Sequence, residues 1–535
     1  MDRRPDIIIF NPDQMRADSL HHLGNPVSAT PFLDSFSEKS VSFSACFCQN
    51  PVCVPSRCSF MTGLYPHVHG HRTMGNQLKE GEESLLMELK EAGYQVWSNS
   101  RNDLVSGSVD GLAEKHVTDM FYGGNVPSAP GPVNPEIRGK RGNKDFYSFF
   151  NGELRRDDNG KNYTSDDEDL DAAISFIRNR DDDRPLCLFL GLLYPHPPYQ
   201  VEEPYYSSVD RLALKPRIKS SETEGKAKIL GLIRKYQGID GRYTEEDWAE
   251  LRSVYLGMCM KVDEQFRKLC DALKETGVYD NAAVFFFSDH GDFTGDYGLT
   301  EKTQNTFEDC LTNVPLLIKP PAGYKLDPGI SDSLVELVDF YATVLDMTGT
   351  TASHDHFGRS LLPVLADRSL KIRDFVCSEG GRLGKEKHCA EGCDPEEASW
   401  RRNVVYWPRY AAQWDDEAHA KGTMIRTDRY KYIHRSGARD EFYDLVSDPG
   451  ERRNLIDDEE HKDVILSLKL KLLDWYQETA DVVPYKIDSR FSPRMVWEKV
   501  KLLCPEGHEE EVKEKIRCGM VLFQALEYCK RLGGL

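Results

Sequence analysis

Three short apolar runs, each followed directly by a polar cluster, constrain the fold of this chain most. The runs cover residues 7–10, 186–193 and 284–287, and stretches with helical periodicity separate them. This alternation is typical of an α/β protein with a mostly parallel central sheet flanked by helices. The polar clusters after the runs are Asn11–Gln14, Tyr194–Tyr199 and Ser288–Asp292. Because ligands bind beyond the carboxyl ends of parallel strands, we expect these clusters to share one site.

The chain has 535 residues, enough for a large domain and a smaller one. We assign residues 1–370 to the large α/β domain. Residues 371–480 are expected to form a smaller C-terminal α+β subdomain, because residues 422–454 have the pattern of antiparallel strands joined by turns. Residues 481–535 are predicted to form a charged helical tail, either solvated or docked on a second copy of the chain as an oligomer contact.

The charge balance limits the classes of partner. Lys and Arg total 68 against 88 Asp and Glu, a net charge of −20, which argues against binding of nucleic acid or anionic membranes. An anionic substrate therefore needs a local cluster of cationic side chains. The apolar run at residues 7–10 is too short for a secretion signal, and no other segment has membrane-spanning length, so we expect a cytoplasmic protein.

The fourteen cysteines do not make a dense disulfide framework in a chain of this length. In a reducing compartment they stay thiols. His388, Cys389 and Cys393 resemble part of a zinc site, but no second ligand pair lies nearby in the sequence, so we favour loop thiols there.

The segment Cys53–Gly63 combines residue types that suit an anion-binding helix start. Pro55 suits the first position of a helix and Gly63 its end. Cys53 would then lie just before the helix N-terminus, where free N–H groups attract anions. The planar guanidinium of Arg57, one turn inside the helix, suits a sulfate or phosphate group. A lone cysteine at such a place is more often a buried structural residue.

The same segment matches the pattern C-x-P-S-R-x-x-x-[LM]-T-G and so resembles the signature of the formylglycine-dependent type I sulfatases, a branch of the alkaline-phosphatase-like superfamily. Similar motifs are scattered from residue 6 to residue 457, among them Thr30–Asp34, Asp332–Gly349 and Tyr443–Leu445. The resemblance implies an alkaline-phosphatase-like fold with the sulfatase domain in residues 1–370. It also implies that a formylglycine-generating maturation enzyme oxidises Cys53 to an aldehyde, whose hydrated form is the nucleophile.

The resemblance further implies one divalent metal held by Asp13, the modified Cys53, Asp289 and His290. Carboxylate and diol oxygens suit Ca²⁺, which we expect first, or Mg²⁺. Two features depart from many sulfatases, since Pro12 stands where a second aspartate is common and His290 where an asparagine is common. In both respects the chain is similar to choline sulfatases and phosphonate monoester hydrolases. An imidazole ligand makes Mn²⁺ or Zn²⁺ further options.

Five more residues take catalytic roles by the same resemblance. Arg57 and Lys302 are expected to balance charge on the sulfate, and His196 to protonate the leaving oxygen. After a G-Y turn the family usually has a lysine and a histidine; by position Arg101 replaces the lysine and Asp103 the histidine. The group that deprotonates the second hydroxyl of the diol is then Asp103 or lies elsewhere, and an exposed charged loop is the alternative for this segment.

Together these features predict a sulfuric ester hydrolase that cleaves a sulfate monoester of a carbohydrate or an aryl alcohol. One alternative is a phosphonate monoester or phosphodiester hydrolase with the same nucleophile. Another is a non-catalytic protein that binds sulfated glycans and keeps Cys53 unmodified. Specificity for the alcohol should lie in irregular segments such as 123–162 and 378–420. The second of these carries Trp400, Trp407 and Trp414.

Overall fold

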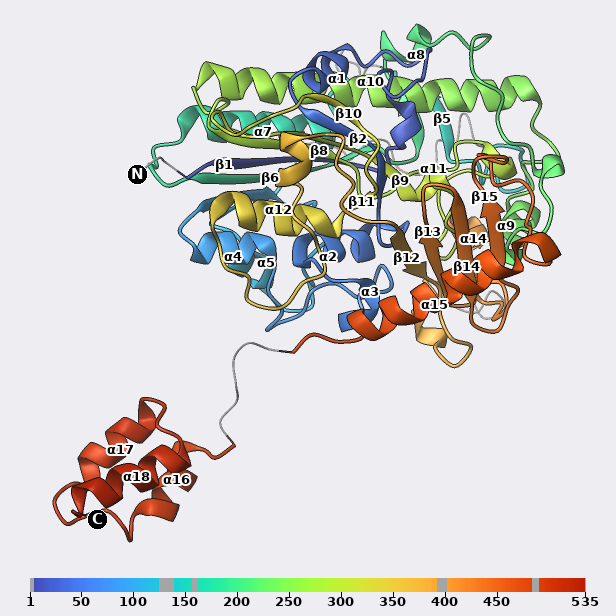
Figure 1. Cartoon of the computed structure of the whole chain (residues 1–535). Helices are drawn as coiled ribbons and strands as arrows, with labels where there is room; N and C mark the ends of the chain where they lie inside the picture. The colour runs from blue at the N-terminus through green and yellow to red at the C-terminus, as the bar shows by residue number, and fades with distance from the viewer. Residues whose placement is uncertain (1–3, 125–138, 156–161, 392–401, 484–489, 535) are drawn as a thin grey trace. The chain divides into compact units, whose positions relative to one another are not determined.

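A large sheet organises the first two thirds of the chain (Figure 1). The computed structural model describes residues 4–124, 139–155, 162–391, 402–483 and 490–534. Within these residues the sheet has nine strands in the order β10-β2-β9-β8-β1-β6-β3-β4, with β11 also paired to β2. The strands are β1 (Asp6–Asp13), β2 (Val41–Phe47), β3 (Gln95–Asn99), β4 (Asp119–Phe121), β6 (Leu186–Pro195), β8 (Ala282–Phe287), β9 (Asn313–Lys319), β10 (Gly329–Ser331) and β11 (Val335–Glu336). Only β9 runs antiparallel to its neighbours, so the described sheet is mainly parallel, as the sequence predicts.

Helices cover both faces of this sheet (Figure 1). Helices α1 (Pro31–Ser37), α7 (Ser165–Asn179) and α10 (Glu245–Glu275) lie on one face. The opposite face carries α2 (Cys53–Thr62), α4 (Leu85–Glu91), α5 (Leu112–His116), α12 (Val338–Thr348) and α13 (Leu362–Ala366). Further helices are α3 (Pro66–His69), α8 (Tyr205–Ser208), α9 (Lys228–Gln237), α11 (Asp309–Thr312) and α14 (Trp407–Gln413). These layers explain why the predicted strands are apolar throughout, since the central strands are covered on both faces.

The side chains of β1 show how one strand supplies both cores. Ile8 and Phe10 join the core under α7 and α10, whereas Ile7 and Ile9 join the core under α2 and α12. All four are fully buried, and their alternation follows from the two-residue period of a strand. Strand β1 therefore packs against both cores. Asp13, its last residue, lies at the end of a central strand of the sheet.

Helix α2 begins slightly earlier than the sequence suggests. Cys53 is its first residue rather than the residue before it, and Pro55 is the third. The helix ends at Gly63, which has φ of 69°. A Cβ there would lie 2.7 Å from Tyr341 Cδ1, so both the backbone angle and the packing require glycine.

The C-terminal part of the larger unit contains a separate four-stranded antiparallel sheet. Its strands are β12 (Val376–Gly380), β13 (Gly422–Arg426), β14 (Tyr430–Arg435) and β15 (Glu441–Asp444), and α15 (Lys462–Thr479) packs against it. A two-stranded sheet joins β5 (Phe150–Glu153) to β7 (Tyr199–Val201), so the described residues 139–155 of the segment 123–162 are less irregular than expected. Both larger sheets belong to one compact unit, residues 1–482, and the subdomain boundary near residue 370 stays a prediction.

Residues 483–535 form a second compact unit. Its described helices are α16 (Pro493–Val500), α17 (Glu509–Arg517) and α18 (Leu522–Leu532). They share a small core of Val496, Val500, Val512, Ile516, Ala525 and Cys529. The helical character of the tail thus agrees with the sequence, and docking on a second copy of the chain stays a prediction.

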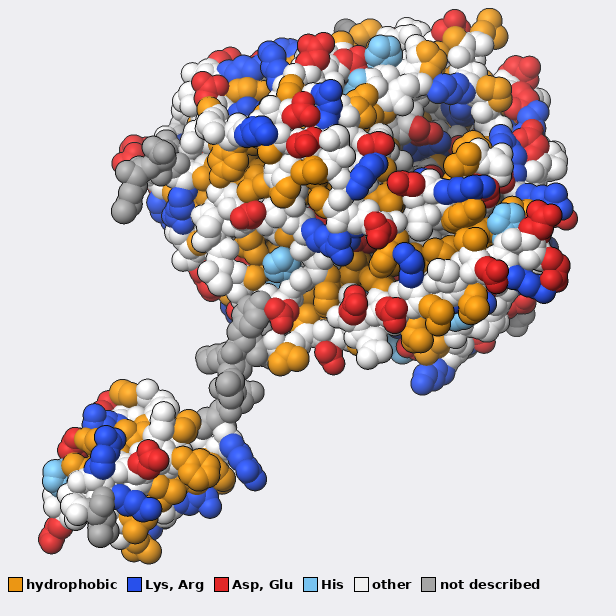
Figure 2. Space-filling model, in the orientation of Figure 1, with side chains coloured by type: hydrophobic (Ala, Val, Ile, Leu, Met, Phe, Trp, Pro, Cys, Tyr) orange, Lys and Arg blue, Asp and Glu red, His pale blue; other side chains and the backbone are white. Residues whose placement is uncertain are grey.

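Surface and thiol chemistry raise no further constraint on the fold. On the face of the larger unit seen in Figure 2, basic and acidic side chains are interspersed rather than gathered by sign. None of the cysteines in the described residues forms a disulfide. Among the described helices, none combines the length and the apolarity needed to cross a bilayer.

Asp263 of α10 caps the start of helix α1 and predicts a pH effect on stability. Its carboxylate accepts hydrogen bonds from the backbone N–H groups of Phe32 and Leu33, at 3.1 and 2.7 Å. Burial nevertheless raises the pKa of Asp263 to about 7, against about 3.9 in an unfolded chain. Because the pKa of Asp263 is higher in the folded protein, its protonated form stabilises the fold. This stabilisation is fully present below the unfolded-state pKa of about 3.9 and is lost as the pH rises towards 7.

We therefore expect the free energy of unfolding of the wild type, relative to Asp263→Asn, to fall by about 2 kcal/mol between about pH 5 and pH 7. Urea unfolding of both proteins at several pH values measures this difference. A difference that stays constant with pH would contradict the raised pKa.

Candidate active site

The polar clusters that follow the apolar runs meet at one edge of the large sheet. Strand β1 lies between β6 and β8 and is parallel to both, so the three strands end on the same side. Asp13 is the last residue of β1, and Asp289 and His290 follow β8. The side-chain amide of Asn11 donates to the carbonyl of Phe287 at 2.8 Å, which ties the two strand ends together. The sequence-based expectation of a shared site is therefore met in space.

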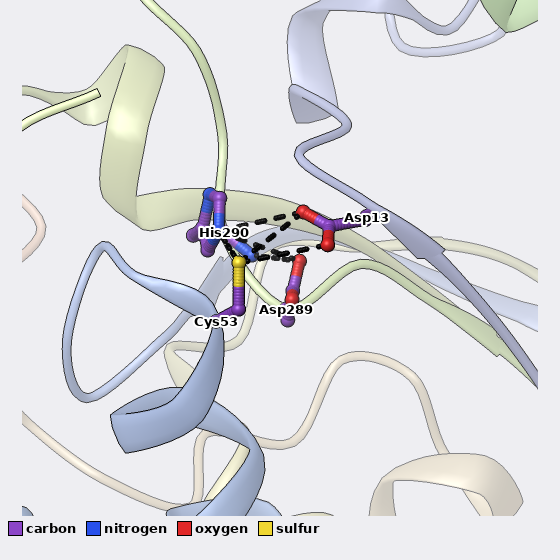
Figure 3. Close-up of side chains that lie close together, drawn as sticks. All are labelled: Asp13, Cys53, Asp289 and His290. Atoms are coloured by element: carbon purple, nitrogen blue, oxygen red, sulfur yellow. Dashed lines mark hydrogen bonds and ion pairs between the residues drawn. The ribbon is translucent and has the colours of Figure 1, made fainter. Parts of the chain in front are cut away.

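Four side chains from three segments converge there (Figure 3). Cys53 reaches the cluster from the first turn of α2, and its Sγ lies 3.5 Å from Asp13 Oδ2 and 3.2 Å from His290 Nε2. His290 Nε2 lies 3.6 Å from Asp13 Oδ1 and 3.8 Å from Asp289 Oδ1. Candidate ligand atoms of all four lie within 4.8 Å of one another, and all four residues are buried. These are the four residues proposed from the sequence as metal ligands.

The donor set suits a cation at the centre of this cluster. His290 Nδ1 lies 3.0 Å from the carbonyl of Gly291, so this nitrogen carries the proton and Nε2 presents a lone pair. That lone pair faces carboxylate oxygens of Asp13 and Asp289, which also only accept hydrogen bonds. Buried acceptors that face one another need a cation between them. Two carboxylates, one imidazole and the atom at position 53 form a set that fits one divalent metal.

Arg57 lies beneath the cluster rather than in the cavity. Its Nε donates to Asp289 Oδ2 at 2.9 Å and its Nη2 to Asp13 Oδ2 at 3.1 Å. Its Nη1 donates to the carbonyl of Asn102 at 3.2 Å. The side chain is fully buried, so its guanidinium orients the two carboxylates in this structure. Arg57 is not among the residues that line the cavity, so its role in contacting the sulfate stays a prediction.

Two other cationic side chains, Arg101 and Lys302, line the cavity next to the cluster. Arg101 Nη2 lies 3.3 Å from Asp13 Oδ2. Lys302 Nζ donates to Gln14 Oε1 at 2.7 Å and lies 3.2 Å from Glu301 Oε1. They supply the local positive charge that the global charge of −20 demands of an anion-binding site.

The charges of the site act on one another. Burial by itself would raise the pKa of Asp13, but Arg57 and Lys302 outweigh it and hold that pKa below its usual value. Burial, aided by Asp13, raises the pKa of the Cys53 thiol well above its usual value. Burial and the positive charges of Lys302 and Arg101 keep the pKa of His196 well below its usual value. The carboxylate is therefore ionised at neutral pH, and the thiol and the imidazole are uncharged.

A cavity of about 620 Å³ opens above the cluster. Asp13 and Cys53 lie at its wall together with four of the predicted catalytic residues, namely Arg101, Asp103, His196 and Lys302. Asp103 is half-buried and has φ of 47°. His196 is also half-buried, and its Nδ1 lies 2.6 Å from the carbonyl of Pro197, so Nε2 is the free acceptor.

Comparisons with known proteins identify the family. A protein-family model described as Sulfatase matches residues 5–350, more than half of the chain. The chain belongs to the sulfatase family. A second model, described as N-sulphoglucosamine sulphohydrolase, C-terminal, matches residues 391–478 of this sulfatase. Family membership places the chain among the sulfuric ester hydrolases.

Individual relatives are distant but cover most of the chain. The multifunctional alkaline phosphatase superfamily protein PehA of Trinickia caryophylli is 24% identical, and the alignment covers 89% of this chain and 96% of that protein. Arylsulfatase K of Danio rerio is 25% identical, and the alignment covers 77% of this chain and 76% of that protein. The crystal structure of the phosphonate monoester hydrolase of Agrobacterium radiobacter superposes with a TM-score of 0.70 at 21% identity, over 90% of this chain and 100% of that one. This structure supports the alkaline-phosphatase-like fold.

The segment 378–420, where specificity was expected, does form one wall of this sulfatase's cavity, but the residues that line it were not predicted. Tyr406, Arg409 and Tyr410, at the start of α14, line it together with His388 and Glu391. Arg409 Nη1 donates to both oxygens of Glu301, at 2.8 and 2.9 Å, and so connects α14 to the residue next to Lys302. A pair of tyrosines four residues apart, with an arginine between them, was the available signal.

The expected tryptophans do not form this wall in the described part of the chain. Trp407 packs against Tyr147 and Tyr236, and neither it nor Trp414 lines the cavity. Trp400 and Cys393 lie outside the described residues. The segment 378–420 therefore does reach the cavity, but through tyrosines, because the Trp407 ring packs against Tyr147 and Tyr236 instead.

Proposed function

We propose that this chain hydrolyses a sulfate monoester of a carbohydrate or an aryl alcohol, through a formylglycine diol at position 53 and one divalent cation. The observation that carries the proposal is the position of Cys53. Its Sγ lies within 3.6 Å of Asp13 and His290 at the base of a cavity that also holds Arg101 and Lys302. Comparison of turnover with aryl sulfates and sugar sulfates tests it directly.

The surroundings of Cys53 favour a modified residue over a free thiol. A thiol needs its thiolate form to act as a nucleophile, and burial together with Asp13 raises the pKa of Cys53 well above its usual value. A maturation enzyme would oxidise the thiol-bearing carbon of Cys53 to an aldehyde, with loss of the thiol sulfur. The aldehyde then adds water to form a diol. The diol supplies one hydroxyl that attacks sulfur and a second whose deprotonation releases sulfate and restores the aldehyde.

The chain's own residues would hold the reacting groups. Asp13, Asp289, His290 and the oxygen at position 53 would bind the cation, for which Ca²⁺ remains our first choice and Mn²⁺, Mg²⁺ or Zn²⁺ are alternatives. The cation would polarise the sulfate oxygens and favour the ionised hydroxyl. Lys302 and Arg101 would balance the charge of the transferred group, while Arg57 would orient the two carboxylates from below.

His196 is the proposed acid for the departing alcohol. It is neutral in the free protein because burial, Lys302 and Arg101 lower its pKa. A bound sulfate ester would offset those two positive charges and raise the pKa of the imidazole towards the value an acid needs. Asp103, also at the cavity wall, is our candidate for the base that acts on the second hydroxyl.

We expect His196→Ala to reduce kcat/KM for phenyl sulfate by about 10²-fold or more. The loss should be much smaller for 4-nitrophenyl sulfate, because its leaving group departs without a proton. Steady-state rates of both proteins with both esters measure this contrast. Equal losses for the two esters would remove His196 from the role of acid.

A second candidate is hydrolysis of phosphonate monoesters or phosphodiesters with the same nucleophile. The single carboxylate of Asp13 after Pro12, the imidazole of His290 and the superposition on a phosphonate monoester hydrolase favour it. Rates with matched aryl sulfate and aryl phosphonate esters separate the two activities. If the protein has neither activity and Cys53 is unmodified, the results would instead support the alternative that it only binds sulfated glycans.

The alcohol part of the substrate is proposed to lie against Tyr406 and Tyr410. Their rings are 6.1 Å apart and stacked, and the guanidinium of Arg409 lies 5.1 Å from the ring of Tyr406. An aromatic wall with polar edges suits a sugar or aryl ring.

A further inference from the structure

A second group of metal-binding side chains lies outside the candidate active site. It consists of His69, the last residue of α3, His71, and Glu82 from a later turn. One candidate ligand atom of each residue lies within 4.8 Å of the others. None of these residues lines the cavity above Cys53. None of the three is among the residues predicted from the sequence to have a role.

The imidazole of His71 is oriented as metal ligands are. Its Nδ1 lies 2.8 Å from the carbonyl of Asn76 and donates to it, so Nε2 presents a lone pair. This Nε2 is buried and has no hydrogen-bond partner in the structure, and His71 is only 4% exposed. A histidine that binds a metal through one nitrogen almost always donates the other to a carbonyl or carboxylate.

The free nitrogen faces a carboxylate. His71 Nε2 lies 3.5 Å from Glu82 Oε2, and that oxygen is held by the backbone N–H of Lys79 at 2.7 Å. An imidazole lone pair and a carboxylate oxygen are both acceptors, so their approach in a buried place is unfavourable without a cation.

His69 completes the set from the solvent side. Its Nδ1 lies 3.9 Å from Glu82 Oε1, and its ring centroid is 6.2 Å from that of His71. The His69 side chain is 37% exposed, so it has room to close on an ion at the bond length of about 2.0–2.1 Å that zinc–imidazole contacts require.

We propose that His69, His71 and Glu82 form a second metal site that takes a divalent cation of the zinc class. Two imidazoles and one carboxylate are ligands that zinc prefers, and a water can occupy the fourth position. The set differs from the oxygen-rich one at Asp13 and Asp289, so the two sites should prefer different ions. Binding at the new site does not depend on the proposed sulfatase activity.

The site is placed to support one rim of the active-site cavity. Thr73, Met74 and Gly75 line that cavity. The two ends of this short loop are connected, since His71 bonds to the carbonyl of Asn76 and the Thr73 hydroxyl donates to Asn76 Oδ1 at 2.7 Å. A cation that holds His71 would therefore restrain the loop.

The test uses the full-length chain with Asp289→Asn, which weakens the first site and leaves the second intact. We expect calorimetric titration with Zn²⁺ to show one tightly bound ion per chain and a raised melting temperature. Co²⁺ in place of Zn²⁺ should give the visible absorption of a four-coordinate site. Adding His71→Ala should weaken Zn²⁺ binding by about 10²-fold or more and abolish the cobalt spectrum.

Two further variants make the result decisive. His69→Gln changes an exposed side chain, so it should weaken Zn²⁺ binding without loss of folding even if His71→Ala does not fold. His354→Gln is the matched control, because both ring nitrogens of His354 are engaged, by Ser353 and by the carbonyl of Thr62. It should bind Zn²⁺ like the parent. Absence of tight Zn²⁺ binding in the parent, or equal binding in His69→Gln, would overturn the proposal.

Discussion

Cys53→Ala is expected to abolish turnover, with a loss of at least about 10⁴-fold in kcat for any ester that the wild type hydrolyses. Alanine keeps the backbone and Cβ at the start of α2 but cannot be converted to an aldehyde. The side chain is buried against Asp13 and His290, so no other described nucleophile stands at that point. Steady-state assays with aryl sulfates and aryl phosphonates measure the loss for both candidate activities.

Cys58→Ala is the matched control for this result. Cys58 is a buried cysteine of the same helix, and its Sγ lies 4.0 Å from the carbonyl of Leu104 instead of in the cavity. Its replacement should leave turnover near the wild-type level. Intact mass adds an independent reading, since conversion of a thiol to an aldehyde removes about 18 Da. The wild type and Cys58→Ala should show this deficit and Cys53→Ala should not; wild-type activity in Cys53→Ala would exclude the mechanism.

Asp289→Asn is expected to release the active-site cation and to lower kcat/KM by about 10³-fold or more. The change removes one negative charge from the cluster and one partner of the Arg57 fork. Metal content after dialysis, measured by mass spectrometry, and turnover with added Ca²⁺, Mg²⁺, Mn²⁺ or Zn²⁺ test both parts. The ion that restores a chelator-treated wild type identifies the physiological metal class.

Asp263→Asn controls for the loss of a buried aspartate. Asp263 caps α1 in the core and lies outside the metal cluster, so its variant should keep both metal and turnover. A second reading is the melting temperature, which shows whether Asp289→Asn merely unfolds the protein. An Asp289→Asn protein that is folded, metal-loaded and active would contradict the assignment of Asp289 as a ligand.

Much of the fold was predictable because its strands are buried on both faces. The runs at residues 7–10, 186–193 and 284–287 became β1, β6 and β8, adjacent and parallel at the centre of the sheet. A strand covered by helices on both sides must be apolar throughout, and that is a local property of the sequence. The start of α2 was displaced from the prediction, because the cap at Val52 depends on backbone angles that composition does not specify.

The candidate site was predictable in its residues and only partly in their geometry. Asp13, Cys53, Asp289 and His290 were named from motifs, and they converge in space. The contacts of Arg57 with two carboxylates were not foreseen, since a guanidinium beside buried acids follows the nearest negative charge. The segment 378–420 was expected near the substrate, but its lining residues Tyr406 and Tyr410 were not predicted, because they lie more than 100 positions after Lys302 in the chain and only packing brings them together.

The order of residues along this chain determined an α/β sheet with polar strand ends and a sulfatase-type nucleophile segment, because strand burial and helix capping act over a few neighbouring residues. The tertiary structure decided which charged and polar side chains lie next to one another. It placed Arg57 beside the carboxylates of Asp13 and Asp289, Arg409 of α14 beside Glu301, and His71 beside Glu82. Such pairings depend on distances between segments that are remote in sequence, and electrostatic energies change steeply with those distances in a buried site.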